Sequence, residues 1–513
     1  MGRPYHRDGD GSSSCCGRLP DRLALVLTFA ASGAVLVLET VSLRLVAPYL
    51  GLSLQVTSAV IGMSLGAIAY GAWLGGWHAD RRDPRRLLAP LLTAAGLATA
   101  VTLPLIRWLG EALRGTSVSM IMALTALTVF VPIMLLSAVP PMVVKLQLGD
   151  LDRTGRVVGR LSGVGTLGAV TATLVTGFVL VAALPTSAIM IGLAVLLGLS
   201  GLALHGYLRR EDRPRTTTAT SRMLAVALLA AGAGLSITAP DPCDVETAYH
   251  CAKVTTDPRR PTGRVLHLNA AEHSYVDLAD PTRLEYGYIQ WFGAAADVVA
   301  APGAAVDAVH LGGGGFTMPR YLAATRPGSR STVFEIDGGL VDLAQRELGL
   351  RTGPALRAVV GDGRLLLAGQ ADKSADLIVG DAFGDLAVPW HLTTREMMAQ
   401  VRRVTRDGGI YVQNVIDGPP LRFIRAELAT VASVFPHVAL VAPEAAVAGR
   451  AGDNFVIVAS ARPLPLQAMG ARLLLLPEAP ELLHGDRLRE FIGDAAVLTD
   501  DYAPVDQMLV RVS

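Results

Sequence analysis

Residues 306–322, VDAVHLGGGGFTMPRYL, decide the fold of the second half of this 513-residue chain. An apolar run ends in four consecutive glycines, Gly312 to Gly315, and a helix-permissive segment follows. A strand, a glycine turn and a helix in this order are typical of a doubly wound α/β sheet. Glycine allows positive φ and a close approach of the backbone to a ligand, and the start of the next helix can face a polar group.

Further apolar runs, each followed by a turn and a helix-permissive segment, predict more parallel strands of the same sheet. These runs are STVFEI (331–336), LRAVV (356–360), ADLIVG (375–380) and GIYVQNV (409–415). Two earlier runs, RVLHLN (264–269) and SYVDL (274–278), predict a small β region before the sheet. Ligands of doubly wound sheets bind at the carboxyl ends of the strands, so the residues after each strand are the candidates for a site.

Carboxylates follow three of these strands. Glu335 ends the second strand, 23 residues after Gly312, and suits both hydroxyls of a ribose. Asp362, followed by Gly363, suits an adenine amino group, and Asp381 lies where the mouth of the site is expected. Each alone is as well explained by a solvated loop, but three behind a glycine turn predict a site for a nucleoside. A nicotinamide dinucleotide is disfavoured, because the spacing G-x-G-x-x-G is absent.

The first half of the chain has the composition of a membrane domain. Hydrophobic residues make up 51% of the sequence, and from residue 23 to residue 240 charged residues fall into short clusters between apolar runs. A spanning helix needs about 20 mostly apolar residues, because every amide in hydrocarbon must be bonded within its own helix. Seven stretches predict a transmembrane bundle: 23–46, 54–77, 87–106, 118–144, 161–183, 187–204 and 223–238. The seventh is the shortest.

Positive charge predicts the orientation of the bundle, because Lys and Arg near the spans stay in the cytoplasm. With the N-terminus inside, the inside segments hold seventeen Lys and Arg residues and the outside loops hold two, Arg107 and Arg114. Seven spans then predict an extracytoplasmic C-terminal domain, whereas six would leave it in the cytoplasm. Cys243 and Cys251, just after the last span, predict a disulfide on an oxidising side, with two unrelated thiols as the alternative.

Several classes of partner are excluded or disfavoured. The net charge is +1 and no basic stripe with interleaved aromatic residues occurs, so we expect no nucleic acid as a partner. A zinc site at the cysteine pair is disfavoured, since only His250 is nearby as a third ligand. We therefore expect no metal and no tightly bound cofactor. The expected partners are the lipid bilayer and small molecules, and the sequence is compatible with a homo-oligomer.

Four segments resemble the spermidine synthases, the polyamine aminopropyltransferases: LGGGGFTMPRYL (311–322), FEIDGGLVDLAQREL (334–348), VVGDGRLLL (359–367) and DLIVGDAFGDLAVPWHLTTREMMAQVRRVTRDGGIYVQNV (376–415). The similarity covers about residues 249–460, and the first half, with GAVLVLETVSLR (33–44), resembles the membrane-bound, fused branch of that family. The expected architecture is an α-helical transmembrane bundle of about seven spans followed by a Rossmann-like, methyltransferase-type α/β domain. The expected segments are a cytoplasmic tail (1–22), the transmembrane domain (23–240), a connecting segment with the small β region (241–300) and the α/β domain (301–513).

The resemblance implies a co-substrate and roles for the strand-end residues. Decarboxylated S-adenosylmethionine would be the donor and methylthioadenosine the product. Glu335 would hold the ribose, and Asp362 with Gly363 would meet the adenine. Asp381 would accept a proton from the attacking amine, which is protonated at neutral pH and cannot attack until a base removes that proton. The glycine loop at the donor is Gly312, Gly313 and Gly314.

The polyamine side departs from the family pattern. Gly315 stands where an aspartate usually follows three glycines, and Gly384 stands at the second aspartate of D-x-x-D, with Asp385 one place late. The sequence YIQ (288–290) replaces a tyrosine, histidine and glutamate, and YH (249–250) replaces a tyrosine and glutamine. The candidate substrate-binding residues are Tyr249, His250, Tyr288 and Asp385. The segment TDDYAPVD (499–506) would add carboxylates only if it folded over the site.

Three functions are compatible with these observations. The first is transfer of an aminopropyl group to a diamine or another amine. The second is an S-adenosylmethionine-dependent methyltransferase on the same fold. The third is a non-catalytic membrane protein that binds or transports a polyamine or nucleoside, which the altered polyamine-side residues favour.

Overall fold

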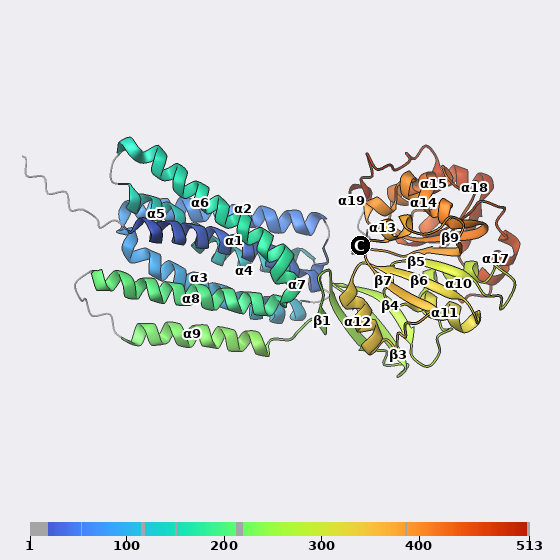
Figure 1. Ribbon diagram of the computed structural model, residues 1–513, viewed down its shortest axis with the longest axis horizontal. Coiled ribbons are helices and arrows are strands. Elements are labelled where there is room, and N and C mark those ends of the chain that lie inside the picture. Colours follow the sequence, from blue (N-terminus) through green and yellow to red (C-terminus); the bar gives the residue numbers. More distant parts are fainter. Residues whose placement is uncertain are drawn as a thin grey trace, which may run out of the picture. The chain divides into compact units, whose positions relative to one another are not determined.

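The computed structural model describes residues 19–52, 54–113, 118–148, 151–211, 219–384 and 387–509, so most of the predicted tail lies outside the described residues. The chain divides into two compact units (Figure 1). One holds the helices up to Asp241, and the other begins at Pro242 and holds the strands.

The first unit is entirely helical, as the apolar stretches predicted. Its helices are α1 Asp21–Leu50, α2 Leu54–Arg81, α3 Pro84–Ala112, α4 Val118–Ser137, α5 Val139–Gln147, α6 Thr154–Val175, α7 Val181–Ala183, α8 Thr186–Glu211 and α9 Ala219–Thr238. Among the described residues, six helical segments are long and apolar enough to cross a membrane, with mean hydropathies between 1.4 and 2.2. The apolar part of α9, Val226–Thr238, is shorter than these six.

Two of the predicted spans contain an interruption. The span 118–144 divides at Ala138 into α4 and α5, where Pro140 and Pro141 have no amide hydrogen with which to continue the helical bonding. The span 161–183 contains a π-helical turn, Thr176–Leu180, between α6 and α7. Hydropathy alone does not reveal such breaks, because the apolar composition continues through them.

Glycines bring the second helix against the break between α4 and α5. A Cβ atom on Gly71 would lie 2.2 Å from the carbonyl oxygen of Met134, and one on Gly75 would lie 2.5 Å from that of Ala138. Such backbone-to-backbone contact is possible only without a side chain. Small residues allow the same close packing between helices in membranes generally.

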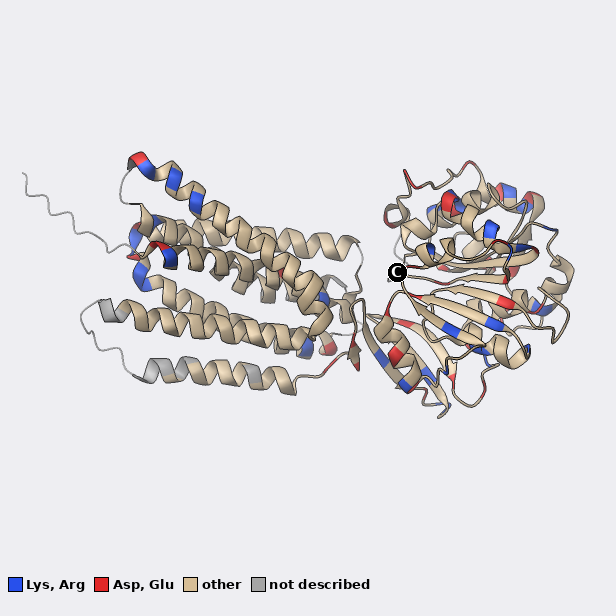
Figure 2. Ribbon diagram, in the orientation of Figure 1, with Lys and Arg blue, Asp and Glu red and all other residues tan. Residues whose placement is uncertain are grey.

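Most charged side chains of the helical unit lie toward the ends of its helices, and Glu39, within α1, is an exception. Figure 2 shows Lys, Arg, Asp and Glu gathered toward the ends of its helices, whereas the α/β unit carries them throughout. Near these ends the Lys145 Nζ atom lies 2.8 Å from Asp80 Oδ1, and an Arg107 guanidinium nitrogen lies 3.2 Å from Asp241 Oδ1. This distribution suits helices whose middle portions lie in hydrocarbon.

The second unit contains two sheets. The strands are β1 Val245–Glu246, β2 Cys251–Thr256, β3 Gly263–Leu268, β4 Ala271–Asp277, β5 Asp307–Leu311, β6 Arg330–Glu335, β7 Leu356–Val360, β8 Ala375–Gly380, β9 Thr405–Asp417, β10 His437–Ala442, β11 Asp453–Ser460 and β12 Glu481–His484. The helices are α10 Gly287–Ala296, α11 Thr317–Thr325, α12 Gly338–Glu347, α13 Gly363–Ala368, α14 Arg395–Val404, α15 Arg422–Ala432, α16 Glu444–Val447, α17 Leu466–Leu473, α18 Gly485–Ile492 and α19 Val505–Met508. The first four strands form an antiparallel sheet in sequence order.

The large sheet has the strand order β12-β10-β11-β9-β8-β5-β6-β7. The strands from β5 to β9 run parallel, as predicted, but β11 pairs antiparallel with β9 and β10 pairs antiparallel with β11 and β12, so the sheet is mixed rather than wholly parallel. The chain builds outward from β5 in one direction through β6 and β7 and in the other through β8 and β9. This reversal places the switch-point crevice between the ends of β5 and β8.

Helices cover both faces of the large sheet. Residues of β5 alternate between two hydrophobic clusters: Val309 and Leu311 pack with residues of α14 and α15, and Ala308 packs with residues of α10 and α11. A strand that is buried on both faces shows a continuous apolar run instead of an alternating one. In β5 the apolar residues Ala308, Val309 and Leu311 are all buried, with the buried His310 between them.

A disulfide joins Cys243 to Cys251 beside the small sheet, with the two Cα atoms 5.2 Å apart. The two cysteines are eight positions apart in the sequence, and the loop between them contains β1 and the turn that leads to β2.

Gly75→Val is expected to destabilise the helical unit by about 1–3 kcal/mol, the usual cost of overpacking. The new side chain would meet backbone atoms of Ala138, and backbone cannot rotate aside. Gly76→Val is the matched control, because a Cβ atom there meets nothing within 4 Å. Thermal unfolding of both variants in detergent would show a lower midpoint for the first alone, and equal midpoints would contradict this packing.

Candidate active site

The glycine loop after β5 is held against the end of β8. Gly312 has φ +93°, and a Cβ atom there would lie 2.3 Å from the carbonyl oxygen of Asp381. Gly314 also has positive φ, +49°. Gly312 therefore has to be glycine for both conformation and space.

The carboxylate of Glu335 binds the amides of this loop. Its Oε2 atom accepts from the amide of Gly313 at 2.7 Å and from that of Gly314 at 3.3 Å. Its Oε1 atom accepts from the amide of Asp337 at 3.0 Å, and the side chain is 6% exposed. Two accepted bonds use both lone pairs of Oε2, so only Oε1 retains capacity for a ligand hydroxyl. The sequence predicted a ribose acceptor at this position, and the structure adds a second role, the positioning of the glycine loop.

Asp362 caps the N-terminus of α13. Its Oδ1 atom accepts from the amides of Arg364 at 2.9 Å and Leu365 at 3.1 Å, and its Oδ2 atom lies 3.1 Å from His391 Nε2. The two amides occupy Oδ1, so the predicted hydrogen bond with adenine would have to be made by Oδ2 or by the neighbouring backbone. Nearby, Asp500 forms a two-bonded ion pair with Arg364, at 2.8 and 2.6 Å.

Asp381 follows β8 at the crevice and is bonded from two sides. Asn414 Nδ2 donates to its Oδ1 atom at 3.1 Å, and the hydroxyl of Tyr288 forms a second hydrogen bond with the carboxylate. Burial raises the pKa of Asp381 to about 6, although these two hydrogen bonds act in the opposite direction. Burial and the charge of Asp381 raise the pKa of Tyr288 well above its usual value, so this hydroxyl stays a donor. Asp381 is thus a carboxylate whose proton affinity is close to that of a general base working near neutral pH.

A cavity of about 480 Å³ opens beside Asp381. Its lining is acidic and aromatic, and among the described residues that line it none is Lys or Arg. The carboxylates are Glu272, Glu285, Asp381, Asp453 and Glu478, and the aromatic residues are Tyr286, Tyr288, Trp291 and Phe383. His273 also lines it, and burial lowers the pKa of this imidazole to about 4, so it adds no positive charge at neutral pH. Such a cavity suits a cation with an apolar body.

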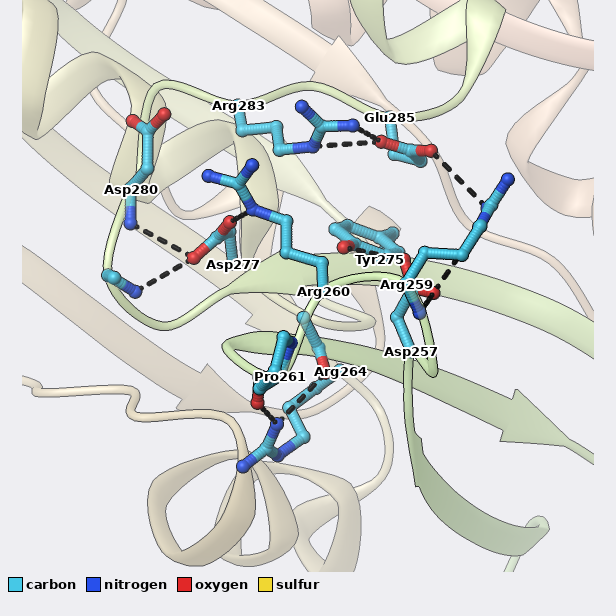
Figure 3. Close-up of polar contacts among 12 residues, drawn as sticks. Asp257, Arg259, Arg260, Pro261, Arg264, Tyr275, Asp277, Asp280, Arg283 and Glu285 are labelled. Carbon is cyan, nitrogen blue, oxygen red and sulfur yellow. Dashed lines mark hydrogen bonds and ion pairs between the residues drawn. The ribbon is translucent and has the colours of Figure 1, made fainter.

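A network of polar contacts behind the cavity holds the segment that carries Glu285 (Figure 3). Arg283 donates to Glu285 at 2.9 and 2.6 Å, and Asp277 pairs with Arg260 while accepting from the amides of Ala279 and Asp280. These contacts order the turn after β4, from which Tyr286 and Tyr288 enter the cavity lining. The ion pair with Arg283 offsets the negative charge of Glu285. The negative potential in the cavity therefore comes mainly from the other four carboxylates, Glu272, Asp381, Asp453 and Glu478.

Four of the five carboxylates were not identified from the sequence. Glu272 comes from β4, Glu285 from the turn before α10, Asp453 from the start of β11, and Glu478 from the segment before β12. Each is a single charged residue outside any motif, so no local pattern distinguishes it. Only the folding of these distant segments around Asp381 brings the charges together.

The predicted substrate-binding residues divide between the cavity and other places. Tyr288 lines the cavity, whereas Tyr249 is 46% exposed and does not. His250 does not line it either, and its Nδ1 atom lies 3.2 Å from Asp337 Oδ2. Asp385 lies outside the described residues. The segment TDDYAPVD supplies no lining residue, and its Asp500 is engaged by Arg364.

The structure also accounts for glycine at position 315. A Cβ atom there would lie 2.8 Å from Ser274 Cβ and 3.0 Å from Val276 Cγ2, and the Gly315 amide donates to Ser274 Oγ at 3.0 Å. Strand β4 thus occupies the space that an aspartate would need.

The strand order, the switch-point crevice and the strand-end carboxylates define a Rossmann-like α/β protein with the features of a nucleoside site. No protein-family model matches the chain. It is 32% identical over 127 residues to a polyamine aminopropyltransferase of Vibrio vulnificus, which covers 24% of this chain and 42% of that protein. It is 34% identical over 143 residues to a probable polyamine aminopropyl transferase of Bifidobacterium longum, with coverages of 27% and 31%. Part of the chain is therefore similar to polyamine aminopropyltransferases, as its motifs predicted.

The match covers less than half the length of each of these two relatives. A solved structure of a probable spermidine synthase from Corynebacterium glutamicum is 27% identical, with a TM-score of 0.47 over 51% of this chain and 97% of that one.

Gly315→Asp is expected to lower the thermal stability of the protein, because the new side chain would displace β4 at Ser274 and Val276. Adding Ser274→Gly should restore part of the loss, since it removes the closest obstructing atom. Gly353→Asp is the matched control, because a Cβ atom there meets nothing within 4 Å. A midpoint for Gly315→Asp equal to that of the control would show that the space is available after all.

Proposed function

We propose that the α/β domain transfers an aminopropyl group from decarboxylated S-adenosylmethionine to an amine and releases methylthioadenosine. One observation carries the proposal: Asp381, a carboxylate with a pKa of about 6, lies between the glycine loop and an acidic, aromatic cavity. The donor would lie on the glycine-loop side and the amine in the cavity. The relationship to the polyamine aminopropyltransferases supports this assignment.

The chemistry requires a base at the junction of the two ligands. Asp381 takes a proton from the ammonium group of the acceptor, which frees the nitrogen lone pair. That nitrogen attacks the aminopropyl carbon bonded to the sulfonium, the new C–N bond forms, and the C–S bond breaks. The electron pair of the C–S bond returns to sulfur, so the cationic donor leaves as the neutral thioether. Tyr288 and Asn414 hold the carboxylate in position during this step.

The acidic cavity favours aminopropyl transfer over methyl transfer. The described lining holds no Lys or Arg, so its carboxylates attract the ammonium groups of a diamine and of the aminopropyl chain. The same field repels the carboxylate of intact S-adenosylmethionine. The usual polyamine-side residues of the family are replaced in this chain. The cavity is nevertheless acidic, because carboxylates from other segments line it.

The decisive experiment is donor-dependent release of methylthioadenosine by the purified full-length protein in lipid nanodiscs, with a panel of mono-, di- and triamines. Decarboxylated S-adenosylmethionine should support release, and S-adenosylmethionine should not. Methyl transfer with the intact donor would establish the methyltransferase alternative. Amine or nucleoside binding without turnover of either donor would establish a binding or transport role instead.

Asp381→Asn should reduce transfer by roughly 10²–10⁴-fold, because it keeps the shape of the side chain and removes the base. Binding of methylthioadenosine, measured by titration calorimetry, should change little. Asp486→Asn, at a fully solvated position, is the control. Turnover of the Asp381 variant at the wild-type rate would remove Asp381 from the mechanism.

The dependence of kcat/KM on pH should show the titration of Asp381. With a pKa of about 6, Asp381 is ionised above that pH, so kcat/KM should fall as the pH is lowered through 6. Tyr288→Phe removes a hydrogen bond to the ionised form, which raises the pKa, so the fall should begin at a higher pH. Tyr249→Phe, outside the cavity, should leave the profile unchanged. A profile that is insensitive to the Tyr288 substitution would assign the acid limb to another group.

We also propose seven spans, a cytoplasmic N-terminus and an extracytoplasmic α/β domain in the cell membrane. The excess of Lys and Arg in the inside segments supports this orientation. Helix α9 has 20 residues, which at 1.5 Å per residue corresponds to about 30 Å, the thickness of the hydrocarbon core. The disulfide between Cys243 and Cys251 supports an oxidising environment for the segment that follows.

A reporter that is active only in the cytoplasm, fused after residue 513, should therefore be silent. Before reduction, a membrane-impermeant thiol reagent should not label Cys243 or Cys251 in intact cells, and after reduction it should label both. Cys15 and Cys16, in the N-terminal tail, serve as the internal control, since they should react only after the membrane is opened. An active reporter together with Cys243 and Cys251 that stay protected from the reagent after reduction would reverse the topology.

A further inference from the structure

We propose that the helical unit contains a second ligand site, which binds a primary alkylamine as its ammonium ion. A cavity of about 370 Å³ lies among α1, α2, the α4–α5 junction and α6. Hydroxyl groups provide most of its polar lining, and none of the described residues that line it is charged. The hydroxyl residues are Thr28, Ser32, Ser137, Ser162 and Thr166.

The broken helix supplies hydrogen-bond acceptors to this cavity. In a continuous helix the amides of residues 140 and 141 would bond to the carbonyl oxygens of Leu136 and Ser137. Pro140 and Pro141 have no amide hydrogen, so both carbonyls lose their helical donors. All four residues line the cavity. Carbonyls at the C-terminal end of an interrupted membrane helix are a recurring means of binding cations.

Ser137 provides an independent indication of a ligand. Its side chain is 7% exposed, and its hydroxyl oxygen has no hydrogen-bond partner among the described residues. Buried hydroxyls are nearly always bonded, so a donor is expected at this position. An ammonium group has three N–H donors and no acceptor, and it therefore matches a cluster of carbonyl and hydroxyl oxygens.

The apolar walls of the cavity determine which group the ammonium ion can carry. Val35, Leu36, Ile68, Val144 and Leu161 form apolar surface beside the oxygen cluster, which fits an alkyl chain. The absence of a carboxylate in the described lining disfavours a second ammonium group, because an unpaired charge there would be costly. Glu39 continues the face of α1 that carries Ser32 and Val35, one turn farther on. An ionisable residue within a membrane span commonly marks a ligand pathway.

The test uses the full-length protein in nanodiscs and hexylamine that carries a photoreactive diazirine on its chain. Peptide mapping should find the label on residues 28–36 or 136–169, and excess hexylamine should remove it. Hexanol, with the same chain and no charge, should compete at least tenfold more weakly, and 1,6-diaminohexane should also compete poorly. Empty nanodiscs measure the partition of the probe into lipid.

Ser137→Ala should weaken labelling roughly tenfold, the scale of one hydrogen bond to a charged group. Ser64→Ala is the matched control, because Ser64 Oγ is also buried and without a partner among the described residues but does not line the cavity. Pro140→Ala, which restores an amide able to bond the Leu136 carbonyl, should weaken labelling independently. Equal competition by hexanol, equal effects of the two serine variants, or label confined to residues 271–478 would overturn the proposal, and the last result would assign amine binding to the α/β domain alone.

Discussion

The bond between the Glu335 carboxylate and the amides of Gly313 and Gly314 is the interaction on which the rest of the site depends. It joins the end of β6 to the loop after β5, and Gly312 in turn packs against the backbone of Asp381 after β8. Three strand ends are thereby held in one arrangement. A carboxylate is suited to this task, because it accepts several amide hydrogens at once and the loop offers amides that no helix or strand uses. The location of Asp381 at the crevice therefore follows from the bonding of Glu335 two strands away in the sheet.

The acidic lining of the cavity is assembled from several segments of the chain. Strand β4 fills the space beside Gly315, which leaves no room for an aspartate there, while Glu272 at the start of the same strand lines the cavity. Asp453 and Glu478 add charge from segments late in the chain. Electrostatic attraction acts over several ångströms, so a cation requires the summed field of nearby carboxylates more than any one carboxylate at a given position. The aromatic walls then select ligands with an apolar body.

The two proposed cation sites would use different oxygen acceptors. In the α/β unit the oxygens belong to carboxylates, of which Glu285 is paired with Arg283. In the helical unit a carboxylate within the cavity would be expensive, and the oxygens come instead from hydroxyls and from carbonyls that Pro140 and Pro141 release. Close packing of Gly71 and Gly75 against the same break supports an interrupted helix that would otherwise expose its backbone to lipid.

The sequence by itself determined the features that depend on local composition and order. Apolar length predicted the helical unit, and the runs ending at Leu311, Glu335 and Gly380 predicted strands of a doubly wound sheet, because such patterns follow from the spacing of side chains along one element. Tertiary structure alone decided the antiparallel end of the sheet, the break at Ala138, the bonding of Glu335 to the glycine loop, and the meeting of Glu272, Glu285, Asp453 and Glu478 around Asp381. These features depend on distances between residues far apart in the chain, which packing and the closure of long loops establish and which no local pattern records.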